Sequence, residues 1–203
     1  MSLIVIANPK GGVGKSTIAT NLAGYFASTR QGVLLGDLDE QQSSLNWLKL
    51  RPAQLPNITA CHDALEKLAK PARKGTPLIV DTPAGFKGEA LQQVLKHADK
   101  VLVPLQASMF DILATENFLR ELDSYRHRCE IGIVGMRINA RTKAAEQLQH
   151  YVEQLNLPVL AYLRETQNYI QLAAHGASLW DVSPSRVDKD LPQWQDLLNW
   201  LEK

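Results

Sequence analysis

The chain is poor in the residues that build disulfide-linked or cysteine-ligated folds. Its 203 residues include two cysteines, Cys61 and Cys129, which lie far apart and form no Cys-x-x-Cys pair. This spacing argues against a disulfide framework, a zinc knuckle and an iron–sulfur site held by cysteine pairs. We therefore expect two reduced thiols and a cytoplasmic protein.

Long apolar runs and a strong excess of one charge are also missing. No apolar run approaches the ~18–20 residues that span a membrane, and the chain opens on a strand-like segment, so we expect no secretion signal. The formal net charge is +1, and any binding to nucleic acid must therefore come from a local patch. Without linkers, repeats or low-complexity segments, we expect one domain over residues 1–203.

What is present is an alternation of apolar strands and amphipathic helices. Apolar runs predict strands at Ser2–Ala7, Gly32–Asp39, Thr76–Asp81, Lys100–Leu105, Glu130–Ile138 and Pro158–Leu163. Helical spacing of apolar residues predicts helices at 16–29, 42–50, 87–97, Asp111–Tyr125, Thr142–Leu155 and Asp188–Lys203. Several strands are continuously apolar, which is typical of a sheet covered on both sides. The predicted fold is α/β, a mostly parallel sheet with helices on both faces.

The stretch NPKGGVGKST, Asn8–Thr17, joins the first predicted strand to the first predicted helix. It matches the phosphate-loop pattern G-x-x-x-x-G-K-[ST] at Gly14–Ser16, with Pro9 in place of the first glycine. In such a loop, backbone N–H groups and the start of the following helix bind phosphate oxygens. The predicted nucleotide-binding residues are Gly11, Gly12, Val13, Gly14, Lys15, Ser16 and Thr17.

Each polar side chain of this loop has an expected role in binding Mg²⁺ and ATP. Lys15 would neutralise the β- and γ-phosphates, the Ser16 hydroxyl would ligate Mg²⁺, and Thr17 would bond the α-phosphate. The pattern and its position between a strand and a helix indicate a P-loop NTPase.

Acidic residues follow two of the predicted strands. Asp37 and Asp39 end the second strand, and Asp81 ends the third. In an open parallel sheet these ends meet at one edge, where carboxylates can support Mg²⁺ and orient a hydrolytic water. An aspartate at a strand end can also be a helix cap or a turn former, and this alternative stays open for all three.

The loop KGGVGKST resembles the deviant Walker A loop of the ParA/MinD family of ATPases. The resemblance implies that Lys10 is the signature lysine, which reaches the phosphates of the partner's ATP across a nucleotide-sandwich dimer; a solvated loop lysine is the alternative. The segment LLGDLDEQQSSLNWL resembles the ParA segment that usually reads D-x-D-P-Q. By that match Asp39 orients the water and Asp37 supports the metal shell, while Glu40 replaces the usual proline.

Later segments extend the resemblance over nearly the whole chain. LIVDTPAG resembles the Walker B strand, which implies that Asp81 holds Mg²⁺ through a water. VLVPLQASMFDILATENFL resembles the segment that opens the family's long helix, where we expect Asp111 to cap the helix. GMRINARTK lies where the family recognises adenine, and the Asn139 amide suits a purine edge, although a cap or turn is an equal alternative.

A basic segment offers a candidate DNA-binding face, as the resemblance implies. Residues 124–143 hold five basic side chains and one acid, a local charge of +4. Ordinary solvated arginines are the alternative. With Arg164, which lies further along the chain, the candidate DNA-binding residues are Arg126, Arg128, Arg137, Arg141, Lys143 and Arg164. The charges of residues 189–203, in the last predicted helix, sum to −1, so we expect this helix to pack on the core and not to bind a membrane.

Together these features predict a ParA-type ATPase that forms an ATP-sandwich dimer, binds DNA non-specifically and drives plasmid or chromosome partition. Its catalytic residues would be Lys10, Lys15 and Asp39, and its cofactors would be ATP and Mg²⁺. A centromere-binding or cargo adaptor protein would stimulate hydrolysis and so reset the cycle. No helix-turn-helix domain is expected, and the ATP-bound form would associate with the nucleoid. One alternative is a positioning ATPase for a chemoreceptor cluster or microcompartment. Another is a metabolic enzyme of the dethiobiotin synthetase type.

Overall fold

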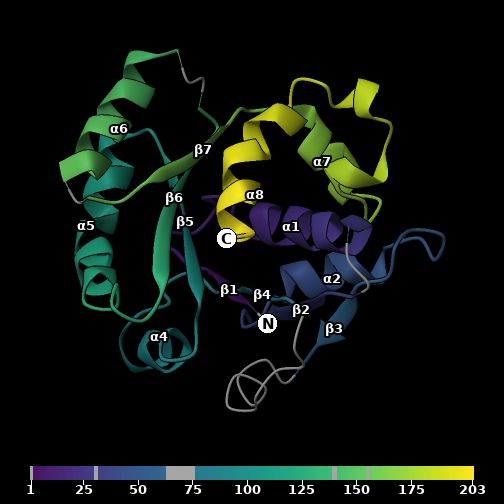
Figure 1. The fold of residues 1–203 in the computed structure, drawn as a ribbon, viewed down its shortest axis with the longest axis horizontal. Coiled ribbons are helices and arrows are strands. Elements are labelled where there is room, and N and C mark those ends of the chain that lie inside the picture. The colour runs from purple at the N-terminus through teal and green to yellow at the C-terminus, as the bar shows by residue number, and fades with distance from the viewer. Residues whose placement is uncertain (1, 30–31, 63–75, 139–140, 155) are drawn as a thin grey trace.

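A seven-stranded parallel sheet forms the centre of the molecule in the computed structural model, which describes residues 2–29, 32–62, 76–138, 141–154 and 156–203 (Figure 1). The strand order is β3-β2-β4-β1-β5-β6-β7. The strands are β1 Leu3–Ile6, β2 Leu34–Asp37, β3 Thr59–Cys61, β4 Leu78–Asp81, β5 Lys100–Gln106, β6 Glu130–Met136 and β7 Val159–Leu163. The predicted α/β class and parallel sheet are confirmed.

Helices cover both faces of the sheet (Figure 1). One face carries α1 Lys15–Thr29, α2 Ser43–Lys49, α7 Gln167–Ala173 and α8 Gln195–Leu201. The opposite face carries α4 Gly88–Leu95, α5 Met109–Asp123 and α6 Lys143–Gln154. Short 3-10 turns follow α7, at η1 Leu179–Asp181, η2 Pro184–Arg186 and η3 Leu191–Trp194.

The alternation of side chains along each strand divides the core into two layers. In β1, Leu3 and Val5 enter the layer beneath α4, α5 and α6, while Ile4 and Ile6 enter the layer beneath α1 and α8. All four of these side chains are buried, each at most 5% exposed. This two-sided burial explains why the strands are continuously apolar in sequence.

Two elements are absent from the sequence-based prediction. β3 has three residues and lies at the edge of the sheet, so it shows no apolar run of useful length. α7 exposes Ile170, 64% of whose surface is accessible, and its apolar face is correspondingly narrow. Both elements depend on tertiary contacts that local periodicity does not reveal.

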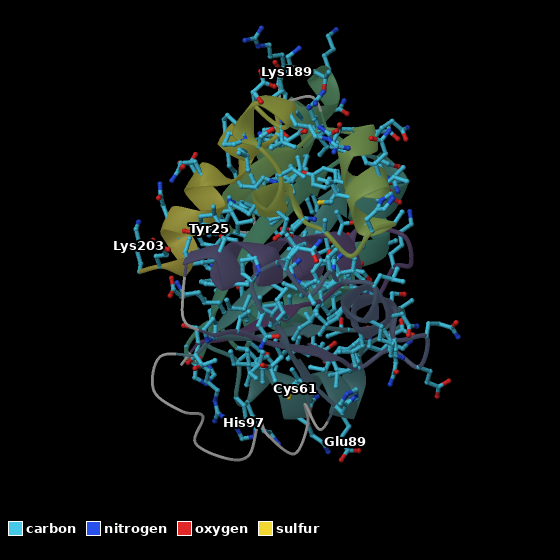
Figure 2. All side chains as sticks on the ribbon, turned by 90° about the vertical axis from the view of Figure 1, so that its right-hand side faces the viewer. Tyr25, Cys61, Glu89, His97, Lys189 and Lys203 are labelled. Carbon is cyan, nitrogen blue, oxygen red and sulfur yellow. The ribbon has the colours of Figure 1, made fainter. Side chains whose placement is uncertain are left out.

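The C-terminal helix packs on the core as expected, although it is shorter than predicted. α8 begins only at Gln195, after the 3-10 turn η3, which contains a proline at its start. The hydroxyl of Tyr25 in α1 donates to Glu202 Oε1 at 2.8 Å, and Figure 2 shows Tyr25 close to the chain end at Lys203. In the described part of the chain, no helix has the length and apolar content needed to cross a bilayer.

Candidate active site

The candidate site lies at the carboxyl edge of the sheet, beyond β1. The loop after β1 leads to α1 on one face, while the loops after its neighbours β4 and β5 lead to α4 and α5 on the other. In parallel sheets, loops that diverge in this way open a crevice in which ligands bind. The register pairs Asp37 of β2 with Asp81 of β4, so these two residues lie side by side on neighbouring strands.

Asn8, which follows β1, organises the phosphate loop from within. Its side-chain amide donates to Pro104 O at 2.8 Å, and its Oδ1 accepts the N–H of Lys10 at 2.8 Å. The residue is 1% exposed. A buried amide with both ends bonded fixes the backbone direction from β1 into the loop. This role is not apparent from the sequence alone, because an asparagine before a proline is typical of many turns.

Two glycines are required by the path of the loop. Gly12 and Gly14 have φ angles of 72° and 104°, in the left-handed region that residues with a Cβ rarely adopt. A Cβ on Gly14 would also lie 2.5 Å from Met136 Cε. The loop therefore takes a left-handed path at both glycines just before α1 begins at Lys15, as expected of a glycine-rich phosphate loop.

Lys15 holds its ammonium group against the loop that carries it. Its Nζ donates to Asn8 O at 3.1 Å and to Lys10 O at 3.0 Å. Burial lowers the pKa of Lys15, and the nearby carboxylates of Asp81 and Asp39 oppose that shift. Lys15, the predicted phosphate ligand, therefore shares one electrostatic environment with two of the three predicted strand-end acids, Asp39 and Asp81.

Lys10 points away from Lys15 and forms an ion pair with Asp111 on α5. The Lys10 side chain is 42% exposed, whereas the Asp111 side chain is 5% exposed. The expectation that Asp111 caps its helix is wrong, because α5 starts at Met109 and Ser108 occupies the N-cap position. Asp111 lies inside the first turn, where its carboxylate is free to turn toward the phosphate loop.

Asp81 is a buried carboxylate whose surroundings suit the binding of a cation. Burial raises its pKa to about 6, Asp37 adds to the rise, and the Ser16 and Ser44 hydroxyls and Lys15 oppose it. The Ser44 hydroxyl donates to Asp81 Oδ2 at 2.7 Å, while the buried Oδ1 has no hydrogen-bond partner. An unpaired carboxylate oxygen beside the Ser16 hydroxyl fits the donor set of Mg²⁺.

Asp37 is engaged as an external cap for α2. Its Oδ1 accepts the N–H of Asp39 at 3.0 Å, and its Oδ2 accepts the N–H of Ser44 at 2.8 Å. Burial raises the pKa of Asp37, while these N–H groups and that of Leu45 lower it. Both carboxylate oxygens are thus occupied by backbone donors, which supports the capping alternative over the predicted role in the metal shell.

Asp39 lies half-buried in the turn that joins β2 to α2. Its Oδ1 accepts the N–H of Gln41 at 2.9 Å, and its carbonyl accepts the N–H of Gln42, also at 2.9 Å. The turn forms without the proline that Glu40 replaces, because Gln42 adopts a left-handed conformation with φ 49°. Asp39 is close enough to Lys15 to oppose the lowering of the Lys15 pKa. Its water-orienting role stays a prediction.

No all-protein metal cage lies at this edge. Among the described residues, no three histidine, cysteine, aspartate or glutamate side chains gather as a metal site. A Mg²⁺ ion bound with a nucleotide needs only one or two protein ligands, since phosphates and waters complete its shell. Ser16 and Asp81 are the residues whose placement fits that kind of site.

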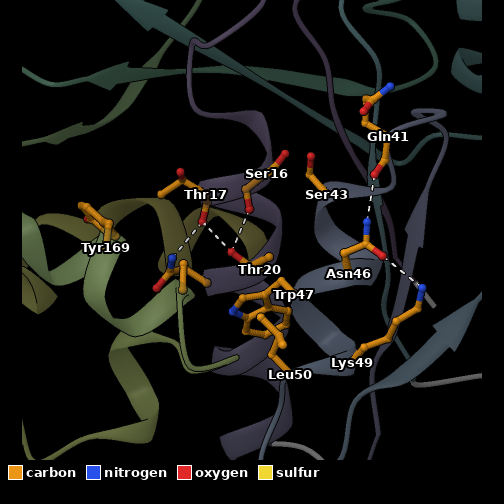
Figure 3. Close-up of a pocket in the computed structure, with 12 residues that line it drawn as sticks. Ser16, Thr17, Thr20, Gln41, Ser43, Asn46, Trp47, Lys49, Leu50 and Tyr169 are labelled. Atoms are coloured by element: carbon orange, nitrogen blue, oxygen red, sulfur yellow. Dashed lines mark hydrogen bonds between the residues drawn. The ribbon is translucent and has the colours of Figure 1, made fainter.

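A pocket of about 720 Å³ adjoins the start of α1. Ser16 and Thr17 face Ser43 and Asn46 of α2 across its upper part, and Trp47 forms its floor (Figure 3). The Asn21 amide of α1 donates to Thr17 O at 2.8 Å, so the lining is tied to the phosphate loop. The pocket places α2, the helix after the acidic turn, directly beside the predicted nucleotide site.

The predicted basic residues are divided between the two ends of β6. Arg126 and Arg128 precede the strand, whereas Arg137, Arg141 and Lys143 follow it, and its seven residues span about 20 Å. Their role in binding DNA stays a prediction. Arg164 donates to the buried Asp190 at 2.6 Å, a contact within the fold. The predicted adenine contact, Asn139, lies outside the described residues.

Comparisons with known proteins agree with this geometry. A sequence model of the CobQ/CobB/MinD/ParA nucleotide-binding domain matches residues 4–179. The maintenance of carboxysome distribution protein A of Halothiobacillus neapolitanus is 26% identical over 189 residues, covering 88% of this chain and 87% of that protein. The chromosome-partitioning ATPase Soj of Thermus thermophilus is 28% identical over 182 residues, covering 72% and 73% of the two chains.

A solved structure shows the same fold over the full length. Apo McdA of Cyanthece superposes with a TM-score of 0.76 at 19% identity, and the match covers 98% of this chain and 99% of that structure. Members of the ParA/MinD group are P-loop ATPases that hydrolyse ATP. The chain belongs to the CobQ/CobB/MinD/ParA nucleotide-binding family.

Proposed function

We propose that this chain is a ParA-type ATPase that binds Mg²⁺ and ATP, dimerises with two nucleotides in the interface, and binds DNA without sequence preference in that state. The observation that carries the proposal is the divergence of two lysines on one loop. Lys15 donates to carbonyl groups of its own loop, whereas Lys10 leaves the loop, pairs with Asp111 of α5 and is 42% exposed. We infer that Lys15 serves its own nucleotide and that Lys10 serves the nucleotide of a second subunit.

Each residue of the site has its own role in the proposed hydrolysis. In the proposed dimer, Lys15 and the Lys10 of the second copy stabilise negative charge on the transferred phosphoryl group. Asp39 orients the attacking water, and Ser16 with Asp81 holds the Mg²⁺ shell. The ion supplies charge neutralisation between the β- and γ-phosphates when it is bound. Hydrolysis is slow until a partner protein stimulates it, which resets the dimer.

The cargo has two candidates that share this chemistry. A protein named for carboxysome distribution matches this chain over 87% of its own length, which favours the positioning of a protein assembly. A chromosome-partitioning ATPase matches over 73% of its length, which favours the segregation of a plasmid or chromosome. The two differ in the adaptor, a cargo-bound protein or a centromere-binding protein. A pull-down from a native lysate with the ATP-bound protein distinguishes them.

DNA retention measured with ATP, with ADP and across a salt series tests the function itself. We expect ATP to strengthen retention at least tenfold over ADP, and we expect retention to fall steeply as salt rises, because phosphate contacts release counterions. Equal retention with both nucleotides would contradict the proposal. Turnover that depends on a small-molecule substrate, by a dimer formed without ATP, would instead support a metabolic enzyme of the dethiobiotin synthetase type.

A further inference from the structure

Ser44, the second residue of α2, joins two acidic strand ends. It is fully buried, with 0% of its surface accessible. Its backbone N–H donates to Asp37 Oδ2 at 2.8 Å, and its hydroxyl donates to Asp81 Oδ2 at 2.7 Å. Asp37 and Asp81 are register partners on adjacent strands. One residue of a helix thus bonds both carboxylates at the edge where the nucleotide site lies.

The hydroxyl of Ser44 decides how the Asp81 carboxylate is presented. Because Oδ2 accepts the hydroxyl, Oδ1 is the oxygen left without a partner, and it is buried. Oδ1 is therefore the atom offered to the metal shell. Without the hydroxyl, the carboxylate could rotate and share its charge between two unpaired oxygens. Groups that orient a ligand in this way typically change metal affinity by about 10- to 100-fold when they are removed.

The same residue fixes the turn that carries Asp39. The turn from residue 38 to residue 43 is held at its start by Asp37, which accepts the Asp39 N–H at 3.0 Å. It is held at its end by Ser44, through both of the bonds described above. Gln42, at the N-cap position of α2, makes no side-chain cap bond. Leu38 N–H also donates to Asp81 O at 3.0 Å, so Asp37, Asp81 and Ser44 together anchor the two ends of this turn.

We propose that Ser44 is a positioning residue that aims Asp81 Oδ1 at the Mg²⁺ shell and couples occupancy of that shell to the turn carrying Asp39. The inference rests on the proposed binding of Mg²⁺ and ATP. Ser44 does not touch the reacting atoms; it acts through Asp81 on one side and through the start of α2 on the other. A change at the metal site is transmitted to the predicted water-orienting residue through one hydroxyl.

Binding of the non-hydrolysable analogue AMPPNP, measured by calorimetry across a Mg²⁺ series, tests the first half of this proposal. Ser44→Ala should raise the Mg²⁺ concentration at half-saturation about tenfold or more, and should leave nucleotide binding in EDTA unchanged. Ser44→Thr keeps the hydroxyl and should restore the parent value. The matched control is Ser28→Ala, an exposed serine near the far end of α1 that is not among the pocket residues, and this variant should behave like the parent.

Hydrogen exchange tests the coupling. We expect Mg²⁺ with AMPPNP to protect residues 38–50 in the parent and in Ser44→Thr, but not in Ser44→Ala. An unchanged Mg²⁺ midpoint together with unchanged protection in Ser44→Ala would overturn the proposal and leave Ser44 a structural contact. If Ser44→Ala fails to fold, Ser44→Cys keeps the volume with a weaker donor and is judged by the same criteria. A parent that binds no nucleotide at all would overturn the proposed function, and this inference with it.

Discussion

The ammonium group of Lys10 and the carboxylate of Asp111 form an ion pair within one chain, between the phosphate loop and the first turn of α5. The Asp111 carboxylate is only 5% exposed. If Lys10 moved away, this carboxylate would be left without a counter-charge in a poorly hydrated environment. The pair therefore opposes any movement of Lys10 toward a second subunit. The proposed ATP-dependent dimerisation would have to replace this contact with one to nucleotide phosphates.

Asp111→Asn should make the ATP-bound dimer form more readily. The substitution keeps the shape of the side chain and removes the charge that holds Lys10, so the competing contact weakens. Because Lys10 is partly exposed, we expect a modest gain of about twofold to fivefold in dimer affinity. Sedimentation velocity with ATP over a concentration series measures it. Asp123→Asn, at the other end of α5, serves as the control, and a weaker dimer with Asp111→Asn would refute the competition.

Lys15→Ala should remove nucleotide binding, and Lys10→Ala should not. Lys15 lies against the loop carbonyls of Asn8 and Lys10, where phosphates would replace them as partners. A charge-assisted contact of this kind contributes about 1.5–3 kcal/mol, so ATP affinity should fall about 10- to 100-fold or more. Calorimetry on the monomeric protein separates the two lysines. Unchanged affinity in Lys15→Ala would contradict the assignment of the phosphate loop.

Asp81→Asn should stabilise the nucleotide-free protein in a pH-dependent way. Burial raises the pKa of Asp81 from 3.8 to about 6, so the folded protein takes up this proton more readily than the unfolded chain. The stability that Asp81 contributes is therefore complete below about pH 4 and is lost as the pH rises through 6. At pH 7.5 the buried charge costs about 2–3 kcal/mol, which the asparagine removes.

Urea unfolding without Mg²⁺ or nucleotide checks this prediction. The free energy of unfolding of Asp81→Asn should exceed that of the parent at pH 7.5 and should nearly equal it at pH 4. A constant difference across this range would show that the charge of Asp81 is not the source. A less stable variant at pH 7.5 would show that a partner in the fold compensates the carboxylate fully.

The basic residues at the two ends of β6 can be tested against each other. Arg137 and Arg141 follow β6 at the edge that holds the phosphate loop, while Arg126 and Arg128 precede it at the opposite edge. A surface that appears only in the ATP dimer has to lie near the nucleotide edge. We therefore expect charge reversal of Arg137 and Arg141 to weaken DNA retention and to lower its salt dependence.

The same reversal at Arg126 and Arg128 should leave DNA retention close to that of the parent. Arg126 already pairs with Asp123 and donates to Asn156 O at 2.9 Å, so it is committed to the fold. Electrophoretic shifts with random-sequence duplex measure both variants in ATP. The opposite pattern, with loss only in the Arg126 and Arg128 variant, would move the DNA surface to the other edge.

Much of the fold was accessible from the sequence because its determinants are local. The apolar runs and helical spacings that predict the six main strands and the long helices record two-sided burial in a parallel sheet. The phosphate loop was predictable for a similar reason, since Gly12 and Gly14 sit where only glycine fits the backbone. Short elements such as β3 carry too few residues for any period to show.

The contacts that the sequence could not reveal join residues far apart in the chain. Lys10 meets Asp111, and Ser44 meets Asp81, only because the sheet brings their loops to one edge. The capping role of Asp37 depends on its bonds to the backbone N–H groups of Asp39 and Ser44, which the sequence pattern does not show even where it predicts the helix start. Likewise, the basic segment looks continuous in sequence, but a buried strand divides it between two edges of the molecule.

The central claim is that Lys10 acts across a dimer interface and not in its own subunit. The most direct measurement is the mass of the protein in solution with Mg²⁺ and ATP, in a background of Asp39→Ala, where hydrolysis should be blocked. We predict that Asp39→Ala accumulates as a dimer and that Asp39→Ala with Lys10→Ala stays monomeric while it still binds ATP. A double variant that dimerises as well as the single variant would contradict the account.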